Sequence, residues 1–193
     1  MTDRRRESVA ERRERRAAID DPEVVLAAAA RFLEVRARSV LEVRRRLASA
    51  GYRADLVDAA IARLLDLGVL DDATFARTWV ESRDRARPRG ERALADELRV
   101  RGVDRAVIGE TLKARRGTAA AGTMDGDGPS ADEAAAARLV ARNARALARV
   151  DDPRARRQRV YALLARNGFD PGVCATVARR FAADAEAADS DEG

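Results

Sequence analysis

Apolar residues recur along this chain in a seven-position pattern that occurs three times, each time around a glycine. Counted from that glycine, the pattern occupies positions −8, −4, 0, +1, +5, +6 and +10. The three copies are Val43, Leu47, Gly51, Tyr52, Leu56, Val57 and Ile61; Leu94, Leu98, Gly102, Val103, Val107, Ile108 and Leu112; and Val160, Leu164, Gly168, Phe169, Val173, Cys174 and Ala178. Steps of four residues place apolar side chains on one face of a helix. Each copy therefore predicts a helix that ends at the glycine, an apolar residue at +1 that fills the core, which we call the plug, and a second helix.

The glycine fits the position just past a helix end, where the left-handed conformation costs no Cβ clash. Gly51 and Gly102 are 51 residues apart, whereas Gly102 and Gly168 are 66 apart. The longer interval requires an insertion, and a glycine-rich stretch at residues 117–130 lies in the right place. This stretch predicts a flexible linker.

Helix starts are marked by capping residues. Ser39 with Glu42, and Ser130 with Glu133, have the spacing of capping boxes. Acid-proline pairs, which suit the cap and first turn of a helix, start three further helices: Asp21-Pro22, Asp152-Pro153 and Asp170-Pro171.

No segment shows the alternating β-branched pattern of strands, and runs of alanine favour helix. The sequence therefore predicts an all-α protein, an elongated array of three tandem three-helix modules. The expected divisions are a disordered charged arm at 1–20, module 1 at 21–68, module 2 at 69–116, the flexible linker at 117–130, module 3 at 131–182 and an acidic disordered tail at 183–193.

Composition excludes several kinds of catalytic and metal site. The chain has no histidine, one cysteine and one lysine, so it cannot form a Ser-His-Asp or Cys-His arrangement, a thiolate zinc site or an intramolecular disulfide. No glycine-rich phosphate loop precedes Lys113. Cys174 occupies an apolar pattern position and is expected in the core. We expect neither catalysis nor a bound cofactor or metal.

The charge distribution favours an anionic partner. The net charge is +5, and residues 21–180 hold 31 basic and 23 acidic residues. A basic body suits a polyanion or an acidic protein groove, although a GC-rich genome would also enrich arginine. No apolar stretch approaches the roughly 20 residues of a membrane span, and the charged N-terminus lacks a signal-peptide core. We expect a cytoplasmic protein without membrane association.

Three longer motifs, in this order, resemble those of one protein family. They read Arg36-x-Arg38-Ser39-x-x-Glu42-x-x-Arg45-x-Leu47-x-x-x-Gly51-Tyr52, running into Gly68-Val69-Leu70-Asp71-Asp72-x-x-Phe75-Ala76; then Arg87-x-x-Gly90-x-x-x-Leu94-x-x-x-Leu98-x-x-x-Gly102-Val103; and Leu163-Leu164-x-x-x-Gly168-Phe169. Over residues 24–181 the chain is similar to the RecX family of regulators of the RecA recombinase. It departs from the family in the linker, the charged tails and the near absence of lysine.

The resemblance implies a curved array of three-helix bundles that lies along the groove of a RecA filament on single-stranded DNA. Such proteins restrain the ATPase and strand exchange of RecA, or limit filament growth, in recombination, DNA repair and the SOS response. The resemblance implies no catalysis, and we expect a monomer.

Arginines outside the apolar faces are the candidate contacts, because a guanidinium can bind carboxylates or phosphates through two parallel hydrogen bonds. For any single arginine, an ordinary solvated face is the alternative. The candidates for contact with the RecA filament or with phosphate are Arg38, Arg44, Arg45, Arg46, Arg53, Arg87, Arg89, Arg154, Arg159 and Arg166. The structural motif positions are Gly51, Tyr52, Gly102, Gly168 and Phe169.

Two other classes remain open. A DNA-binding protein acting without RecA would suit the helix-glycine-helix units, but Asp55, Asp58, Asp66 and Glu110 place acids on the candidate reading helices. A helical adaptor with an unrelated partner is the third class. The aromatic residues Tyr52, Phe75, Trp79 and Phe169 are expected in the core, so any direct DNA contact would be mainly electrostatic.

Overall fold

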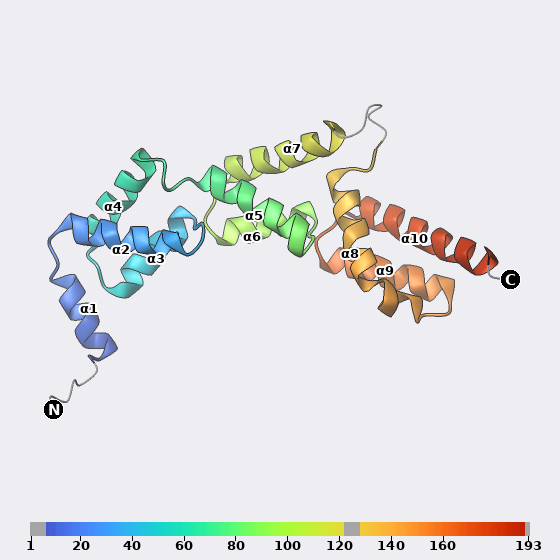
Figure 1. The fold of residues 1–193 in the computed structure, drawn as a ribbon, viewed down its shortest axis with the longest axis horizontal. Coiled ribbons are helices and arrows are strands. Elements are labelled where there is room, and N and C mark those ends of the chain that lie inside the picture. The colour runs from blue at the N-terminus through green and yellow to red at the C-terminus, as the bar shows by residue number, and fades with distance from the viewer. Residues whose placement is uncertain (1–6, 122–127, 192–193) are drawn as a thin grey trace. The chain divides into compact units, whose positions relative to one another are not determined.

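Ten α-helices make up the regular structure of the described residues, in agreement with the predicted all-α class (Figure 1). The computed structural model describes the backbone of residues 7–121 and 128–191 and the side chains of residues 7–117 and 128–184. The helices are α1 (Val9–Ala17), α2 (Pro22–Glu34), α3 (Val40–Ala50), α4 (Ala54–Asp66), α5 (Asp72–Ala86), α6 (Glu91–Val100), α7 (Arg105–Ala121), α8 (Ala131–Ala148), α9 (Pro153–Arg166) and α10 (Pro171–Asp191).

Two compact units divide the chain. The first comprises Met1–Ala76 with Val100–Asp104, and the second comprises Arg77–Arg99 with Arg105–Gly193. In the first unit, α2, α3 and α4 enclose one apolar core that includes Val43, Leu47, Val57 and Ile61.

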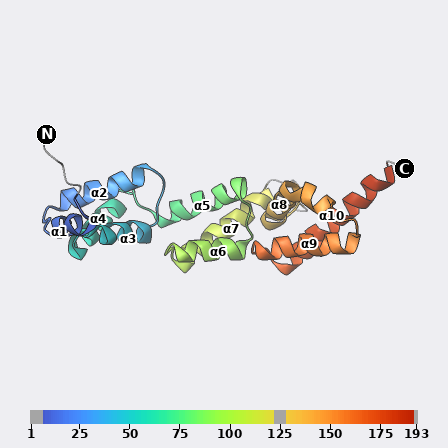
Figure 2. The same ribbon diagram turned by 90° about the horizontal axis from the view of Figure 1, so that it is seen from below.

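In the second unit, α8, α9 and α10 enclose a separate core, and Figure 2 shows these helices side by side. This core contains Val160, Leu164, Phe169 and Cys174, and the repeated pattern predicts all four as core residues. Cys174 is a buried free thiol, and burial raises its pKa. Its predicted core position is confirmed.

The repeated glycines end helices as predicted. Gly51, Gly102 and Gly168 have φ angles of 100°, 78° and 80°, in the left-handed region that favours glycine. After Gly51, the Tyr52 N–H donates to the Leu47 carbonyl at 3.4 Å. After Gly168, the Phe169 N–H donates to the Leu164 carbonyl at 3.3 Å. In both copies, the glycine thus turns the chain so that the next residue plugs the core.

The predicted caps are confirmed at five helix starts, including Asp170, which accepts a hydrogen bond from the Gly172 N–H in the first turn of α10. Complete capping boxes join Ser39 to Glu42 and Ser130 to Glu133. The carboxylates of Asp21 and Asp152 accept hydrogen bonds from backbone N–H groups in the first turns of α2 and α9. These residues satisfy donors that a helix start would otherwise leave unpaired.

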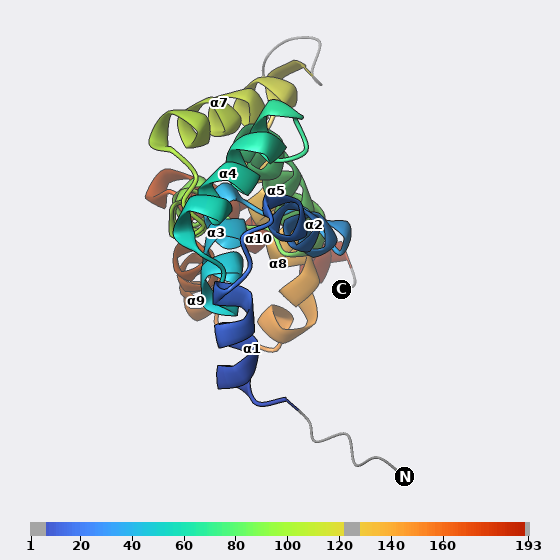
Figure 3. The same ribbon diagram turned by 90° about the vertical axis from the view of Figure 1, so that its left-hand side faces the viewer.

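The N-terminal segment differs from the predicted disordered arm 1–20, because residues 9–17 form α1. Ser8 and Glu11 make a capping box. Arg16 donates to the carbonyl of Ala50 at the end of α3, with a nitrogen–oxygen distance of 3.2 Å. Polar contacts thus hold a helix that buries no residue of its own. Residues 1–6 lie outside the described residues. In Figure 3, α1 extends beyond the group formed by α2–α4.

Two other predicted breaks are also partly helical. α7 continues past Gly117 to Ala121, so the first residues of the predicted linker 117–130 are helical. α10 continues to Asp191 through the predicted disordered tail 183–193. Alanine is the strongest helix former and one glycine costs a helix only about 1 kcal/mol, which accounts for both extensions. Residues 122–127 and 192–193 lie outside the described residues.

Candidate functional site

Two of the candidate arginines, Arg38 and Arg46, lie over one aromatic ring in the first unit, and a third, Arg45, lines the same depression. The guanidinium carbon of Arg38 lies 4.3 Å from the centroid of the Phe32 ring, and that of Arg46 lies 5.7 Å from it. They border an open depression of about 310 Å³, which we call the Phe32 patch. Its lining residues are Phe32, Arg38, Glu42, Arg45, Arg46 and Ser49. Glu42, Arg46 and Ser49 share a stripe of α3 because they follow one another at helical spacing.

The positive charge of the Phe32 patch is only partly neutralised. Glu42 is its one acid, and both carboxylate oxygens of Glu42 already accept hydrogen bonds from Arg36 at 3.3 Å. The Arg38 Nε is buried without a hydrogen-bond partner. Burial, reinforced by the charges of Arg36 and Arg46, lowers the pKa of Arg38. An arrangement of this kind favours an added anion.

Arg44 and Arg53 lie outside this patch and are held by acids of their own unit. Arg44 forms an ion pair with Asp58 of α4. Arg53 forms ion pairs with Asp20 and with Asp55, and its hydrogen bond to Asp55 raises the Arg53 pKa. A partner would have to displace these exposed pairs to reach either guanidinium.

Arg87 and Arg89, in the second unit, have different surroundings. Arg87 is exposed and its side chain forms no ion pair with another described residue. Arg89 is half-buried and donates to the Asn167 side-chain oxygen at 2.6 Å. Its Nε has no hydrogen-bond partner and lies 3.7 Å from a Glu97 oxygen. Arg89 therefore contributes to internal packing, while Arg87 faces solvent.

The three candidate arginines of α9 are all exposed. Arg154, Arg159 and Arg166 form no ion pair with another described residue. Arg159 and Arg166 are seven residues apart, so they lie on one stripe of the helix, while Arg154 lies on a different stripe. The sequence thus identified exposed arginines correctly here, but the three do not form one cluster.

The aromatic residues have the predicted structural character. Phe75 and Phe169 are buried. Trp79 is half-buried, and its indole N–H donates to Glu97 at 2.8 Å. Tyr52 packs against the core of the first unit, with the Arg16 guanidinium 5.7 Å from its ring centroid. None of them is an open platform for base stacking.

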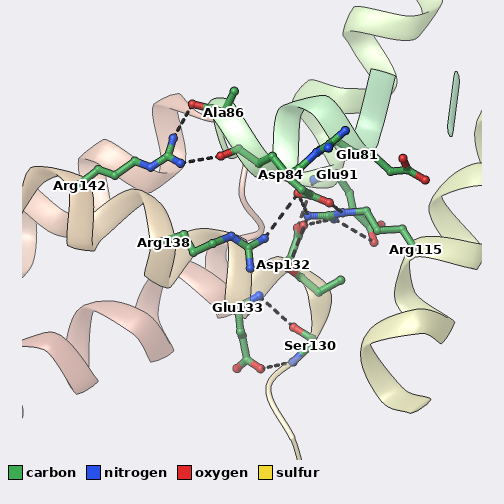
Figure 4. A network of polar contacts seen from close by, with 12 residues as sticks. Glu81, Asp84, Ala86, Glu91, Arg115, Ser130, Asp132, Glu133, Arg138 and Arg142 are labelled. Atoms are coloured by element: carbon green, nitrogen blue, oxygen red, sulfur yellow. Dashed lines mark hydrogen bonds and ion pairs between the residues drawn. The ribbon is translucent and has the colours of Figure 1, made fainter. Parts of the chain in front are cut away.

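Sequence reasoning missed a buried ion cluster in the second unit, drawn in Figure 4. The side chain of Arg115, on α7, is only 6% exposed. It donates twice to Asp84 of α5, at 2.9 and 3.0 Å, and to Asp132 of α8 at 2.5 Å. Burial by itself lowers the Arg115 pKa, but the hydrogen bonds to the two acids outweigh burial and raise it. We call Arg115, Asp84, Asp132 and Glu91 the Arg115 cluster.

Further contacts lie outside the Arg115 cluster, between α5 and α8 and between the segments next to α6 and α9. Arg142 of α8 donates to the carbonyls of Arg85 and Ala86 at the end of α5, and Arg138 lies 3.9 Å from Asp84 (Figure 4). The Gly90 N–H donates to the Asn167 carbonyl at 3.0 Å.

A charged residue on an apolar stripe could have revealed Arg115. Ile108, Leu112 and Arg115 follow at steps of four and three, so they lie on one face of α7. A buried charge must be paired, but its acids lie 31 residues before it and 17 residues after it. The helical pattern could identify the arginine and not its partners.

Neither a metal-binding group of side chains nor a membrane-spanning helix is found among the described residues. No group of three or more cysteine, aspartate or glutamate side chains there is placed to hold a metal ion. Across the same residues, no helix combines the length and apolar character needed to span a membrane.

These features define a helical repeat protein whose distinctive surface chemistry is exposed or partly paired arginine. Profiles described as the first and second three-helix domains of RecX match residues 26–64 and 71–112. The regulatory protein RecX of Mycobacterium ulcerans is 37% identical over 155 residues, covering 80% of this chain and 83% of its own. That of Mycobacterium avium is 34% identical over 157 residues, covering 81% and 84%. The chain belongs to the RecX family.

Solved structures agree with this fold. The crystal structure of RecX from Lactobacillus salivarius matches with a TM-score of 0.68 and 19% identity, over 84% of this chain and 97% of its own. A second crystal structure of a regulatory protein RecX matches with a TM-score of 0.64 and 16% identity, covering 88% and 72%.

Proposed function

We propose that this protein binds RecA filaments on single-stranded DNA along the filament groove and restrains their ATPase, growth and strand exchange. It acts as a monomer in the cytoplasm, and without catalysis. The observation that carries the proposal is membership of the RecX family across about four fifths of the chain. The arrangement of arginines supports a partner that is anionic at its contact points.

The Phe32 patch is the proposed principal contact. It brings three guanidiniums around one depression whose single acid is already bonded to Arg36. Stacking on Phe32 restricts Arg38 and Arg46, so less side-chain entropy is lost when an anion binds. Carboxylates of the filament proteins, or phosphates of its DNA, are the ligands that such a patch accepts.

The exposed arginines of α9 provide a proposed second contact. A filament presents the same surface at every subunit, so a protein that touches it at two places gains from effective concentration. Two contacts of modest strength then produce tight binding without any deep pocket.

Titration into a RecA ATPase assay tests the function. With RecA and single-stranded DNA in excess, we expect suppression of ATP hydrolysis at well below one copy of this protein per RecA subunit. Such suppression shows that each copy acts on many subunits of a filament. Unchanged hydrolysis at every ratio, with binding to bare DNA retained, would instead support a DNA-binding protein that acts without RecA.

Replacing Arg45 and Arg46 by glutamine should weaken this suppression. If each contributes about 1 kcal/mol through a charge-assisted hydrogen bond at a partly solvated surface, the half-inhibitory concentration rises about thirtyfold. The matched control replaces Arg44 and Arg53 by glutamine, which removes the same charge from the same module. Both control residues are held in ion pairs, so we expect a much smaller effect. Equal losses in the two variants would rule out the Phe32 patch as a specific contact.

A further inference from the structure

Arg115 is positioned to join helices of the second and third modules. Its guanidinium contacts acids on three other helices: Asp84 on α5, Asp132 on α8 and, at 4.0 Å, Glu91 on α6. Arg115 itself belongs to α7, so one buried side chain links four helices of the second unit.

Because Arg115 is buried, its acidic partners must be placed accurately. A buried charge is tolerated only when its partners are correctly placed and remain so. Asp84 receives two parallel hydrogen bonds from Arg115, and Asp132 receives a third. If α8 moved relative to α5 and α7, the carboxylate of Asp132 would leave the guanidinium, and Arg115 would lose one of its two hydrogen-bonded acids while still buried. The cluster therefore penalises relative motion of these helices.

The main chain strengthens this restraint at a second place. A Cβ atom added at Gly90 would lie 2.2 Å from the Gly168 carbonyl oxygen, so the two backbones are in direct contact. Arg89 reaches the Asn167 side chain beside them. The start of α6 and the end of α9 thus meet without intervening side chains.

We propose that Arg115 is a positioning residue that locks α8–α10 onto α5–α7 of the second unit, so that the second and third modules meet their partner as one rigid body. Arg87, on one side of the junction, and Arg159 and Arg166, on the other, are then presented at a fixed spacing. This functional consequence rests on the proposed binding to the RecA filament, whereas the rigidity itself does not.

A fixed spacing between the contact residues strengthens binding. When one contact has formed, the other is held near its own target, and its effective concentration is highest if the connecting body cannot reorient. A hinge at the junction would spread the α9 arginines over many positions. Loss of the lock should therefore weaken filament binding although neither contact surface has changed.

The test measures the junction first in the free full-length protein. Spin labels at Arg92→Cys on α6 and Gln158→Cys on α9, both exposed positions, report the distance between the two sides. The background carries Cys174→Ala. Pulsed electron–electron double resonance should give one narrow distance distribution for the labelled protein with Arg115 intact. The distribution should be at least twice as wide for Arg115→Gln, and of intermediate width for Arg115→Lys. Lysine retains the charge but cannot bond Asp84 through two parallel donors.

An unchanged distribution in Arg115→Gln, even with a lower melting temperature, would overturn the proposal, because the cluster would then only stabilise the fold. Circular dichroism establishes that the variant is folded. If it is not, the double variant Arg138→Gln with Arg142→Gln replaces it, since both side chains are exposed and reach the same junction.

The ATPase assay forms the second arm and separates two kinds of failure. For the unlabelled Arg115→Gln protein, the half-inhibitory concentration should rise about tenfold. If even the unaltered protein fails to suppress the ATPase, the proposed function fails, while the distance measurement still decides whether the junction is rigid. A wider distance distribution with full suppression would refute the role of rigidity in binding.

Discussion

Replacing Gly90 by alanine should lower the free energy of unfolding of the second unit by about 3 kcal/mol, the upper part of the range for overpacked sites. The added Cβ would lie 2.2 Å from the Gly168 carbonyl oxygen, 2.4 Å from its carbonyl carbon and 2.4 Å from the Phe169 Cα. All three are backbone atoms, so no side-chain rotation can relieve the overlap. Urea denaturation followed by circular dichroism measures the loss.

Gly109→Ala is the matched control for this prediction. Gly109 lies in a helix, α7, whereas Gly90 directly precedes α6, and a Cβ atom at Gly109 would meet nothing within 4 Å. The substitution should stabilise the protein by about 0.5–1 kcal/mol, because alanine loses less backbone entropy than glycine on entering a helix. Equal effects of the two substitutions would show that the contact between Gly90 and Gly168 is absent in solution.

The second large effect is expected from Phe169→Ala, which should cost about 3–5 kcal/mol, as removal of a buried aromatic ring generally does. Phe169 is 1% exposed and packs in the core formed by α8, α9 and α10. Its loss leaves a cavity beside Val160, Leu164 and Cys174 that these helices cannot close without losing their own contacts. The measurement is a urea titration of the full chain.

Tyr161→Ala provides the comparison within the same module, because Tyr161 on α9 remains 39% exposed. We expect its cost to be about 1 kcal/mol or less, as for a substitution that opens no cavity. A loss at Phe169 no larger than that at Tyr161 would mean that the repeated plug position does not anchor the third core.

Local sequence signals accounted for most of the fold because they act within a few residues. The stop at Gly51 depends on its own positive φ, and the cap at Ser39 depends on Glu42 three residues away. Burial of Val43 and Leu47 follows from a four-residue step on one helix. Each of these interactions is complete within one or two helical turns, so the sequence predicts it directly.

The prediction of disorder was wrong for residues 9–17, because polar contacts rather than an apolar face hold this helix. The N-terminal segment 1–20 has little hydrophobic periodicity, yet α1 forms with a capping box at Ser8 and a hydrogen bond from Arg16 to the end of α3. Local capping is readable from sequence, but the Ala50 carbonyl that Arg16 reaches lies 34 residues away.

The candidate site was predictable only as a set of residue types. Helical spacing places Arg44, Arg45 and Arg46 outside the apolar face of α3, but it does not reveal that Asp58 engages Arg44. Nor does it reveal that Phe32 lies beneath Arg38 and Arg46, because this contact joins two helices. Which arginines are paired depends on tertiary packing, and the sequence holds no local trace of it.

The hydrogen bond from the Gly90 N–H to the Asn167 carbonyl has a consequence for how the sequence can vary. Both partners are main-chain groups, so they are present whatever side chain occupies position 167, and at position 90 only proline would remove the donor. Geometry, rather than the identity of residue 167, decides whether this bond survives. Related chains can thus exchange their surface charges extensively and still keep this contact, provided that position 90 remains small enough for the two backbones to meet.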